Sequence, residues 1–282
     1  KGEDFLKIAG VQKGELDILD GSPPCSSFST AGLREKAWGE EKKYSDTTQV
    51  TDDLFFEYAR ILKEIQPKVF IAENVKGITM GVSANLLGSS QIDMFGECEK
   101  TIYHNLVNAG YNVRYKVLNA SHYAVPQARE RTIFIGVRKD IDKKITYPKR
   151  LKEVVTVEDA IKDIKADEFN TLSDLQNEIY DFQKYGESMF ECGKRISRKL
   201  GGTTRHKAHR YKPSNTITTN AEVWHYQEKR TLAINELKVI CGFPSDYYVG
   251  EVFSKKWERL GRAVPPLMMC AIALHVYKTI LK

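Results

Sequence analysis

ELDILDGSPPCSSFS (residues 15–29) carries a short apolar run into a Pro-Pro-Cys turn, and KVFIAENV (residues 68–75) carries a second apolar run into a Glu-Asn turn. Such runs, bounded by turn residues, are typical of buried strands. Similar patterns predict further strands at residues 111–120 and 131–138, and helices at residues 51–67 and near 97–109. Strands separated by helices indicate an α/β fold with a parallel-type sheet and helices on both faces. Ligands collect at the carboxyl ends of such strands, where Cys25 and Glu73 are expected.

The chain changes character after about residue 140. Helical patterns return at residues 155–164, 232–240 and 265–281. Residues 166–208 are polar, with scattered aromatic side chains and no clear period. We therefore expect an α/β domain over residues 1–165, a distinct region over residues 166–208, and a return to the first domain over residues 209–282.

Charge is modest overall but concentrated in one tract. The 282 residues carry a formal net charge of +6, which does not by itself indicate a nucleic-acid partner. Residues 194–212, however, hold eight lysines and arginines and no acid. This tract is either a solvated loop or, beside a catalytic cleft, a segment that contacts phosphates.

Cysteine usage and hydropathy limit the environment of the chain. The five cysteines are Cys25, Cys98, Cys192, Cys241 and Cys270. Their number is odd and none forms a CxxC pair, which argues against a disulfide framework or a zinc site and for a reducing compartment. No secretory signal and no apolar run of membrane-spanning length is visible. We expect a cytoplasmic protein without a metal site or a membrane anchor.

Cys25 is a candidate nucleophile. Free cysteines usually pack as small apolar side chains. Cys25, however, follows two prolines that stiffen the backbone, and Ser26, Ser27, Ser29 and Thr30 come after it, which suits an apolar pocket poorly. A thiolate at a strand-to-helix turn, near helix amides or cations, is stabilised and reactive.

Glu73 ends the apolar strand VFIAE, where a carboxylate is costly to bury unless it is paired or protonated. It is either the partner of a nearby arginine or an acid that protonates a ring while Cys25 attacks a carbon of the same ring. Asn74 is expected to fix the turn.

QARER, residues 127–131, places Gln127, Arg129 and Arg131 at alternate positions. This spacing predicts one face of a strand that enters TIFIGV. Three long polar side chains that face inward need anionic or carbonyl partners. A solvated surface strand is the alternative.

In order and spacing, these motifs resemble those of the DNA (cytosine-5)-methyltransferase family of bacterial and phage type. The series is the PPC turn, ENV, QxRxR, PSxT at 213–216, GFP at 242–244 and Gly-x-Ala-Val-Pro-Pro at 261–266. The resemblance covers roughly residues 4–165 and 210–281. It implies a Rossmann-like S-adenosylmethionine-dependent methyltransferase sheet with a small target-recognition domain, placed in residues 166–208.

The resemblance also implies an activity, in which S-adenosylmethionine donates a methyl group to C5 of a cytosine rotated out of double-stranded DNA. Cys25 would add to C6 while Glu73 protonates N3. Arg131 would donate to the cytosine O2, and Arg129 would steady the catalytic loop. Residues 29–48 would be the loop that closes over the base. Restriction-modification or epigenetic marking would be the setting, with the enzyme on the nucleoid.

Binding residues follow from the same resemblance. The implied cofactor contacts are Asp4, Pro24, Arg262, Ala263 and Val264. The recognition region varies within the family, so no base-reading residue can be transferred. The expected DNA contacts are Ser29 and, from the charge of the basic tract, Arg198, Lys199, Arg205, Lys207 and Arg210. Phosphate contacts of this kind position a protein without specifying a sequence.

The sequence departs from the family in two places. The family's aromatic-Ala-Gly-x-Gly-Gly cofactor loop should lie about 75 residues before the catalytic cysteine, whereas only 24 residues precede Cys25. We therefore expect that a missing N-terminal segment or a second subunit supplies this loop, and that the 282 residues alone bind the cofactor poorly. Arg262 stands where the family usually has Asn, so its cofactor contact is in doubt.

Two other functions remain open at this stage. One is an RNA cytosine-5 methyltransferase of the same lineage. The other is a non-catalytic companion subunit that binds DNA, although such a protein need not keep Cys25, Glu73 and Arg131 together.

Overall fold

The computed structural model describes residues 2–23, 42–44, 47–49, 54–79, 102–219 and 222–282; of residues 2–5, 42–44 and 47–49 it describes the backbone only. Internal contacts divide the chain into two compact units. Unit 1 comprises residues 1–118, 130–147 and 276–282, and unit 2 comprises residues 119–129 and 148–275. The predicted recognition region, residues 166–208, thus lies in the same unit as residues 209–275.

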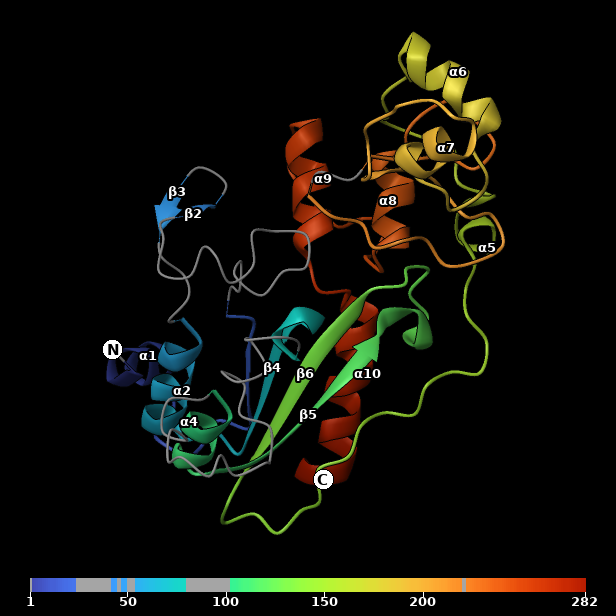
Figure 1. The fold of residues 1–282 in the computed structure, drawn as a ribbon. Helices are drawn as coiled ribbons and strands as arrows, with labels where there is room; N and C mark the ends of the chain where they lie inside the picture. The colour runs from blue at the N-terminus through green and yellow to red at the C-terminus, as the bar shows by residue number, and fades with distance from the viewer. Residues whose placement is uncertain (1, 24–41, 45–46, 50–53, 80–101, 220–221) are drawn as a thin grey trace, which may run out of the picture. The chain divides into compact units, whose positions relative to one another are not determined.

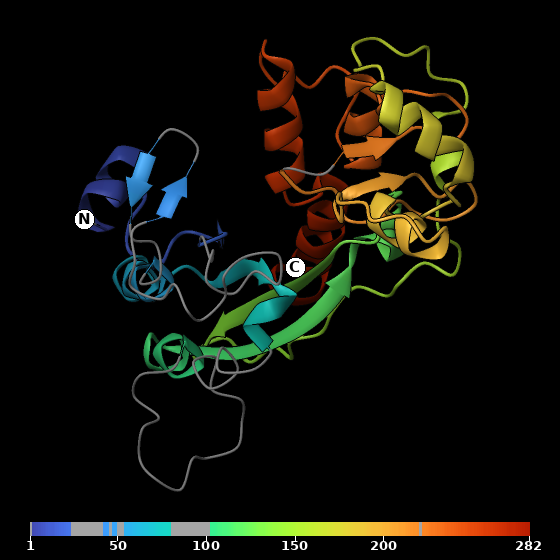
Figure 2. The ribbon, with the colours of Figure 1, turned by 45° about the horizontal axis from the view of Figure 1, so that its top comes forward.

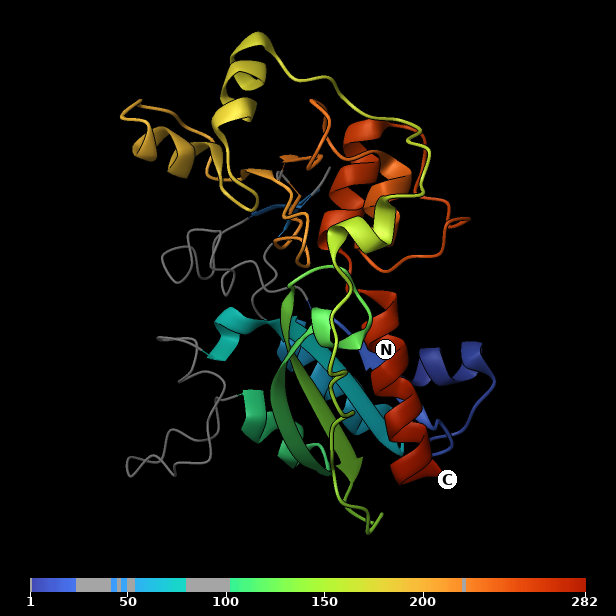
Figure 3. The same ribbon diagram turned by 90° about the vertical axis from the view of Figure 1, so that its right-hand side faces the viewer.

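Unit 1 contains a four-stranded sheet, in the order β1-β4-β6-β5 (Figures 1 and 3). Its strands are β1 (Ile18–Gly21), β4 (Val69–Val75), β5 (Tyr111–Asn119) and β6 (Glu130–Arg138). β1 and β4 run parallel, as predicted, but β4 and β6 run antiparallel, so the expectation of a parallel-type sheet is wrong for that pair. The reason lies in the strand that precedes β6. β6 pairs with β5 as well as with β4, and the short connection from β5 to β6 cannot hold the helical crossover that two parallel neighbours require, so the chain reverses direction at β6.

Unit 1 also contains four helices that precede β5 within its described residues. They are α1 (Gly2–Ala9), α2 (Leu54–Ile65), the short 3₁₀ helix η3 (Lys76–Thr79) and α4 (Ile102–Asn108). One hydrophobic core joins side chains of α2 and α4 to β4, β5 and β6. α2 ends where Gln66 adopts a left-handed conformation (φ 53°) just before Pro67, which confirms the predicted stop. The other ends of the two predicted helices, residues 51–53 and 97–101, lie outside the described residues.

Tyr58 of α2 joins the two parallel strands. Its hydroxyl is positioned to donate to Leu19 O at 3.1 Å and Ile71 O at 3.2 Å, one acceptor on each strand. A Cβ at Gly21 would lie 2.5 Å from the Tyr58 ring, so only glycine fits beside it. The end of β1 that leads into the Pro-Pro-Cys turn is therefore held against β4 by a specific contact.

A hairpin of unit 1 lies within the segment predicted to close over the base. β2 (Lys42–Tyr44) and β3 (Thr47–Gln49) pair antiparallel, as Figure 2 shows in light blue. The rest of residues 29–48 lies outside the described residues.

Unit 2 is mainly helical. Its elements are η5 (Ala120–Tyr123), α5 (Val157–Ile161), α6 (Asp174–Phe182), α7 (Met189–Arg195), β7 (Arg205–Lys207), β8 (Glu222–Trp224), α8 (Ile234–Ile240), α9 (Phe253–Arg262) and α10 (Pro266–Val276), after which η6 (Tyr277–Leu281) returns to unit 1. Helices were predicted at α5, α8 and α10. α6, α7 and α9 were missed, although the first two begin with a capping box, at Ser173 with Gln176 and at Ser188 with Glu191.

One apolar helical stretch merits comment. Within Phe253–Leu281 an 18-residue window has a mean hydropathy of 1.5 and is 28% buried, so length and composition alone would allow it to cross a membrane. Such a stretch is weak evidence of a span. Met268, Ile272 and Val276 are fully buried at one-turn spacing, the pattern of a helix that packs against protein.

Candidate active site

Glu73 and Arg131 form a nearly buried ion pair in unit 1. Glu73 lies in β4 and Arg131 in β6, with Arg131 Nε 2.7 Å from Glu73 Oε1. Glu73 is opposite Ile133 in the sheet register, so Arg131 is its diagonal neighbour on the same face. The side chains are 9% and 12% exposed. Of the two readings of Glu73, the structure thus shows it as the partner of an arginine, and Arg131 has the anionic partner that an inward-facing side chain was expected to need.

Asn74 links this pair to the Pro-Pro-Cys turn. Its side chain is buried, its Oδ1 accepts from Val75 N at 2.8 Å, and its Nδ2 donates to Pro23 O at 3.4 Å. Asn74 therefore fixes the end of β4, as predicted. Asn74 follows Glu73 directly, and its bond to Pro23 O holds the backbone two residues before Cys25.

Three predicted site residues fall outside the described residues: Pro24, Cys25 and Ser29. Their roles stay predictions. The described neighbours of the turn are Gly21, which is paired with Ala72 of β4, and Pro23, which is bonded to Asn74.

Arg129 belongs to unit 2 and has carbonyl partners. Its Nη1 donates to Ile217 O at 2.8 Å and its Nη2 to Arg262 O at 3.2 Å. Gln127 is also buried, and its Oε1 accepts from Ile217 N at 3.1 Å. β6 begins only at Glu130, so the prediction of one strand face for all of QARER is wrong, because Gln127 and Arg129 precede the strand. The expectation of inward groups with carbonyl partners is confirmed for both, since Gln127 Nε2 also donates to Ile240 O at 3.4 Å.

The PSNT motif holds the same segment. Ser214 N donates to Pro126 O and Ala128 N donates to Ser214 O, both at 2.8 Å. The Thr216 hydroxyl donates to Ala128 O at 2.7 Å. Sequence analysis recognised PSNT only by its place in the series; its role in the structure is to fasten the backbone from which Arg129 projects.

The residues implied as cofactor contacts lie in both units. Asp4 is in α1, and its side chain is not among those described. Arg262 ends α9, where its Nη2 lies 2.6 Å from Glu258 Oε1. The chain then leaves the helix at Ala263 in an extended conformation (φ −59°, ψ 147°), and Ala263 and Val264 are half-buried.

The arginines of the basic tract pair with acids within unit 2. Arg198 pairs with Glu178 at 2.6 Å, Arg205 with Glu222, and Arg210 with Glu158 through its Nε at 2.9 Å. The hydrogen bond to Glu158, the largest contribution, raises the pKa of Arg210 above its ordinary value. These arginines reach acids from other segments, which no pattern within residues 194–212 could reveal.

The two lysines of the tract that were expected to contact DNA differ in exposure. Lys207 is half-buried, with its Nζ 3.8 Å from the centre of the Tyr180 ring, and burial lowers its pKa. Lys199 is exposed.

A second buried arginine–glutamate pair lies in unit 2 and was missed by sequence analysis. Arg230 Nη1 and Nη2 each lie 2.8 Å from one oxygen of Glu236, which also accepts from Ala233 N at 2.8 Å. His225 lies beside it, with its Nε2 4.0 Å from Glu236. A glutamate three residues after a helix N-cap is the signal that could have revealed part of this cluster.

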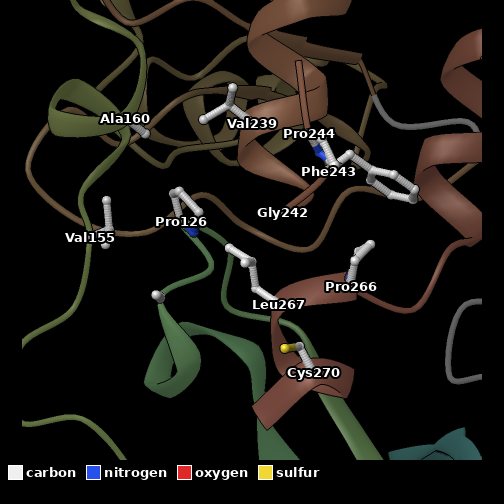
Figure 4. Close-up of a pocket in the computed structure, with 11 residues that line it drawn as sticks. Pro126, Val155, Ala160, Val239, Gly242, Phe243, Pro244, Pro266, Leu267 and Cys270 are labelled. Atoms are coloured by element: carbon white, nitrogen blue, oxygen red, sulfur yellow. The ribbon is translucent and has the colours of Figure 1, made fainter. Parts of the chain in front are cut away.

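An apolar pocket of about 390 Å³ lies in unit 2 (Figure 4). Its lining includes Pro126, Leu267, Cys270 and residues of the GFP turn such as Phe243. Among these described lining residues there is no carboxylate and no cation, so the pocket lacks the groups that a cytosine or a charged cofactor would require. Across the described part of the chain, no cluster of three or more His, Cys, Asp or Glu side chains could hold a metal ion.

Comparison with known proteins decides the family. A family model described as C-5 cytosine-specific DNA methylase matches residues 3–278. The chain belongs to this family. The resemblance inferred from the motifs is thereby confirmed.

Several bacterial methylases have similar sequences. The chain is 32% identical to the type II methyltransferase M1.HphI of Haemophilus parahaemolyticus, over 95% of this chain and 70% of that protein. It is 30% identical to M.BspRI of Lysinibacillus sphaericus, over 97% of this chain but only 63% of that protein. The chain thus spans about two thirds of these methylases.

Solved structures support the predicted fold class. A DNA modification methyltransferase encoded within an Escherichia coli prophage superposes with a TM-score of 0.70 and 20% identity, over 99% of this chain and 83% of that one. The Dnmt2 methyltransferase of S. pombe gives a TM-score of 0.59 at 14% identity, over 99% and 80%. The Rossmann-like α/β methyltransferase fold is confirmed.

Proposed function

We propose that this methylase transfers a methyl group from S-adenosylmethionine to C5 of a cytosine in double-stranded DNA, as the modification enzyme of a restriction-modification system. The observation that carries the proposal is the Glu73–Arg131 pair, with Asn74 bonded to the backbone just before Cys25. The acid Glu73, the cation Arg131 and the thiol Cys25 would thus all act on the same cytosine ring.

The chemistry divides among these residues. Cytosine is rotated out of the duplex because its C5 and C6 cannot be reached inside the stack. The Cys25 sulfur bonds to C6 as Glu73 gives a proton to N3, which leaves C5 nucleophilic. After C5 takes the methyl group, water removes the C5 proton and the C6–sulfur bond breaks. The thiolate then leaves, and N3 returns its proton to Glu73.

The ion pair must open for this reaction. Before substrate arrives, Arg131 stabilises Glu73 as a carboxylate, which is the wrong state for an acid. When the cytosine enters, Arg131 turns to O2 and Glu73 turns to N3. Separation from Arg131 and loss of water then favour protonation of Glu73.

S-adenosylmethionine, when bound, supplies an electrophilic methyl group. Asp4, Pro24, Ala263 and Val264 would hold it, and the extended backbone after α9 suits such contacts. Arg262 is engaged with Glu258, so we give it no direct part. No aromatic-Ala-Gly-x-Gly-Gly sequence is present in the 282 residues, so we propose that this loop comes from another segment or subunit.

Trapping on 5-fluorocytosine tests the proposal. Fluorine at C5 cannot leave as a proton does, so the wild-type protein should remain covalently bound to a fluorinated duplex in the presence of cofactor. Cys25→Ser should abolish the adduct and keep duplex binding nearly intact. Cys270→Ser, which alters an exposed free thiol, is the matched control and should trap normally. Equal trapping by Cys25→Ser would reject Cys25 as nucleophile.

Two alternatives have distinct outcomes. An RNA methyltransferase of the same lineage would transfer tritiated methyl to transfer RNA rather than to duplex DNA. A companion subunit would bind duplex DNA and form no adduct. The family and its bacterial type II relatives favour DNA and a cytoplasmic, nucleoid-associated location.

A further inference from the structure

Two exposed tyrosines meet on the surface of unit 2. Tyr185 follows α6 and Tyr211 follows β7, and they are 39% and 60% exposed. Their ring centres are 6.1 Å apart and the rings stand at 90°. Exposed aromatic side chains that contact each other are costly to hydrate, so they suggest a surface that binds a partner.

The backbone under these rings is fixed. Gly186 N donates to Lys207 O at 2.8 Å, and Asn215 Nδ2 donates to Gly186 O at 3.3 Å. The His209 ring lies 6.2 Å from the Tyr185 ring and 3.2 Å from where a Cβ at Gly186 would be. The backbone beside Tyr185 is therefore held in place before a partner binds, which lowers the cost of ordering this segment on binding.

Cations surround the pair. The Lys207 ammonium lies 5.6 Å from the centre of the Tyr185 ring, and the Arg210 guanidinium lies 5.2 Å from that of Tyr211. Lys184 precedes Tyr185 and Lys212 follows Tyr211, and both are exposed. We call Lys184, Tyr185, Tyr211 and Lys212 the tyrosine–lysine surface. Its charge complements phosphates.

We propose that the tyrosine–lysine surface binds duplex DNA, with the lysines on phosphates and the tyrosines on the edges of bases next to the target. This inference rests on the proposed function and deepens it. Arg198, Arg205 and Arg210 are paired with glutamates, so the exposed lysines are better placed for phosphates. Phosphate contacts carry no sequence information, whereas contacts with base edges do. Tyr185 and Tyr211 are therefore specificity-determining residues.

The test compares two kinds of variant in the full chain. Short duplexes that the wild-type protein enriches from a random pool are labelled, and their affinities are compared with those of shuffled duplexes by fluorescence anisotropy. Tyr185→Ala/Tyr211→Ala should lower the preference for the enriched sequence by about tenfold or more. Lys184→Ala/Lys212→Ala should weaken binding to the enriched and to the shuffled duplex by the same factor. It should also reduce the slope of log affinity against log salt by about 0.9 for each lost phosphate contact.

Matched controls isolate the surface. Tyr248→Ala alters a tyrosine of the same unit that is 71% exposed, and it should behave as wild type. Tyr211→Ala alone keeps the less exposed Tyr185, so it serves if the double variant does not fold. Duplex RNA is the second probe. Unchanged sequence preference in either tyrosine variant, a wild-type protein without sequence preference, or a loss confined to RNA would each overturn the inference.

Covalent trapping separates this inference from the proposed function. If the wild-type protein traps on fluorinated duplex and the tyrosine variants keep the wild-type sequence preference, the inference fails alone. If the wild-type protein does not trap but its sequence preference depends on the tyrosines, the proposed function fails alone.

Discussion

The two buried arginine–glutamate pairs, one in each unit, differ in how far they reach. Arg230 and Glu236 are six residues apart, and Glu236 also accepts from Ala233 N at the start of α8. Glu73 and Arg131 come from strands far apart in sequence, beside the backbone of the Pro-Pro-Cys turn. The local pair closes a turn, so we expect it to serve folding. The cross-strand pair lies where a substrate could separate it, so we expect it to serve chemistry.

Removing the acid of the cross-strand pair should have the largest effect. Glu73→Gln keeps the shape of the side chain but cannot give a proton, so methyl transfer should slow by about 10²–10⁴-fold. Single-turnover transfer of tritiated methyl at saturating duplex measures this. Glu130→Gln, which alters an exposed carboxylate of β6 that is paired with Lys76, is the control and should stay near wild type. A Glu73→Gln rate close to wild type would contradict the assignment.

Breaking the local pair should instead lower stability. Glu236→Ala leaves Arg230 buried without its main partner and should cost about 3–5 kcal/mol of unfolding free energy. Urea unfolding followed by tryptophan fluorescence measures the loss, with Trp224 and Trp257 as reporters in unit 2. Replacing both partners, as Arg230→Met/Glu236→Leu, should recover part of it. If the Glu236→Ala protein were as stable as wild type but transferred methyl groups more slowly, the local pair would serve chemistry rather than folding.

Arg129 differs from both buried pairs, because the described partners of its guanidinium are backbone carbonyls. Arg129→Lys cannot reach both Ile217 O and Arg262 O, so we expect a loss of about 1.5–3 kcal/mol in unfolding free energy. Arg262→Lys keeps the backbone carbonyl that accepts from Arg129 and is the matched control. Equal unfolding midpoints for the two variants would show that these bonds contribute little.

The smallest effect concerns pH. Burial, followed by the charge of Arg230, lowers the pKa of His225 below its ordinary value. Below about pH 6.5 the unfolded state therefore binds more protons than the folded state. The contribution of His225 is complete above that pH and is lost as the pH falls. Between pH 7.5 and 5.5, Tm should fall by about 2–4 °C. In scanning calorimetry, the Tm of His225→Gln should depend less on pH than that of the wild-type protein. If the two curves of Tm against pH coincide, His225 does not contribute to the pH dependence of stability.

Local pattern predicted the elements whose signals lie within a few residues. The apolar runs at β1, β4 and β6 and the helical spacing of α2 were identified, because burial of one element leaves its own periodicity. α6 and α7 were missed because their amphipathic patterns are short and polar, although their capping boxes were visible. The direction of β6 was missed because strand pairing is a long-range choice.

The candidate site divides in the same way. Motif order identified Cys25, Glu73 and Arg131, and the Glu73–Arg131 pair supports their joint role. The expected phosphate-binding arginines were judged by local charge alone. All three are paired with glutamates 17 or more residues away in sequence, and the charge of a tract does not reveal such partners.

By itself, the order of short motifs determined the family, because an α/β methylase needs certain residue types at the ends of certain strands. Only the tertiary structure decided which charges meet. It paired Glu73 with Arg131, gave Arg129 to backbone carbonyls and set Tyr185 against Tyr211. The reason is physical: hydrophobic periodicity is written locally in the chain, whereas an ion pair or a ring contact depends on segments that folding alone brings together.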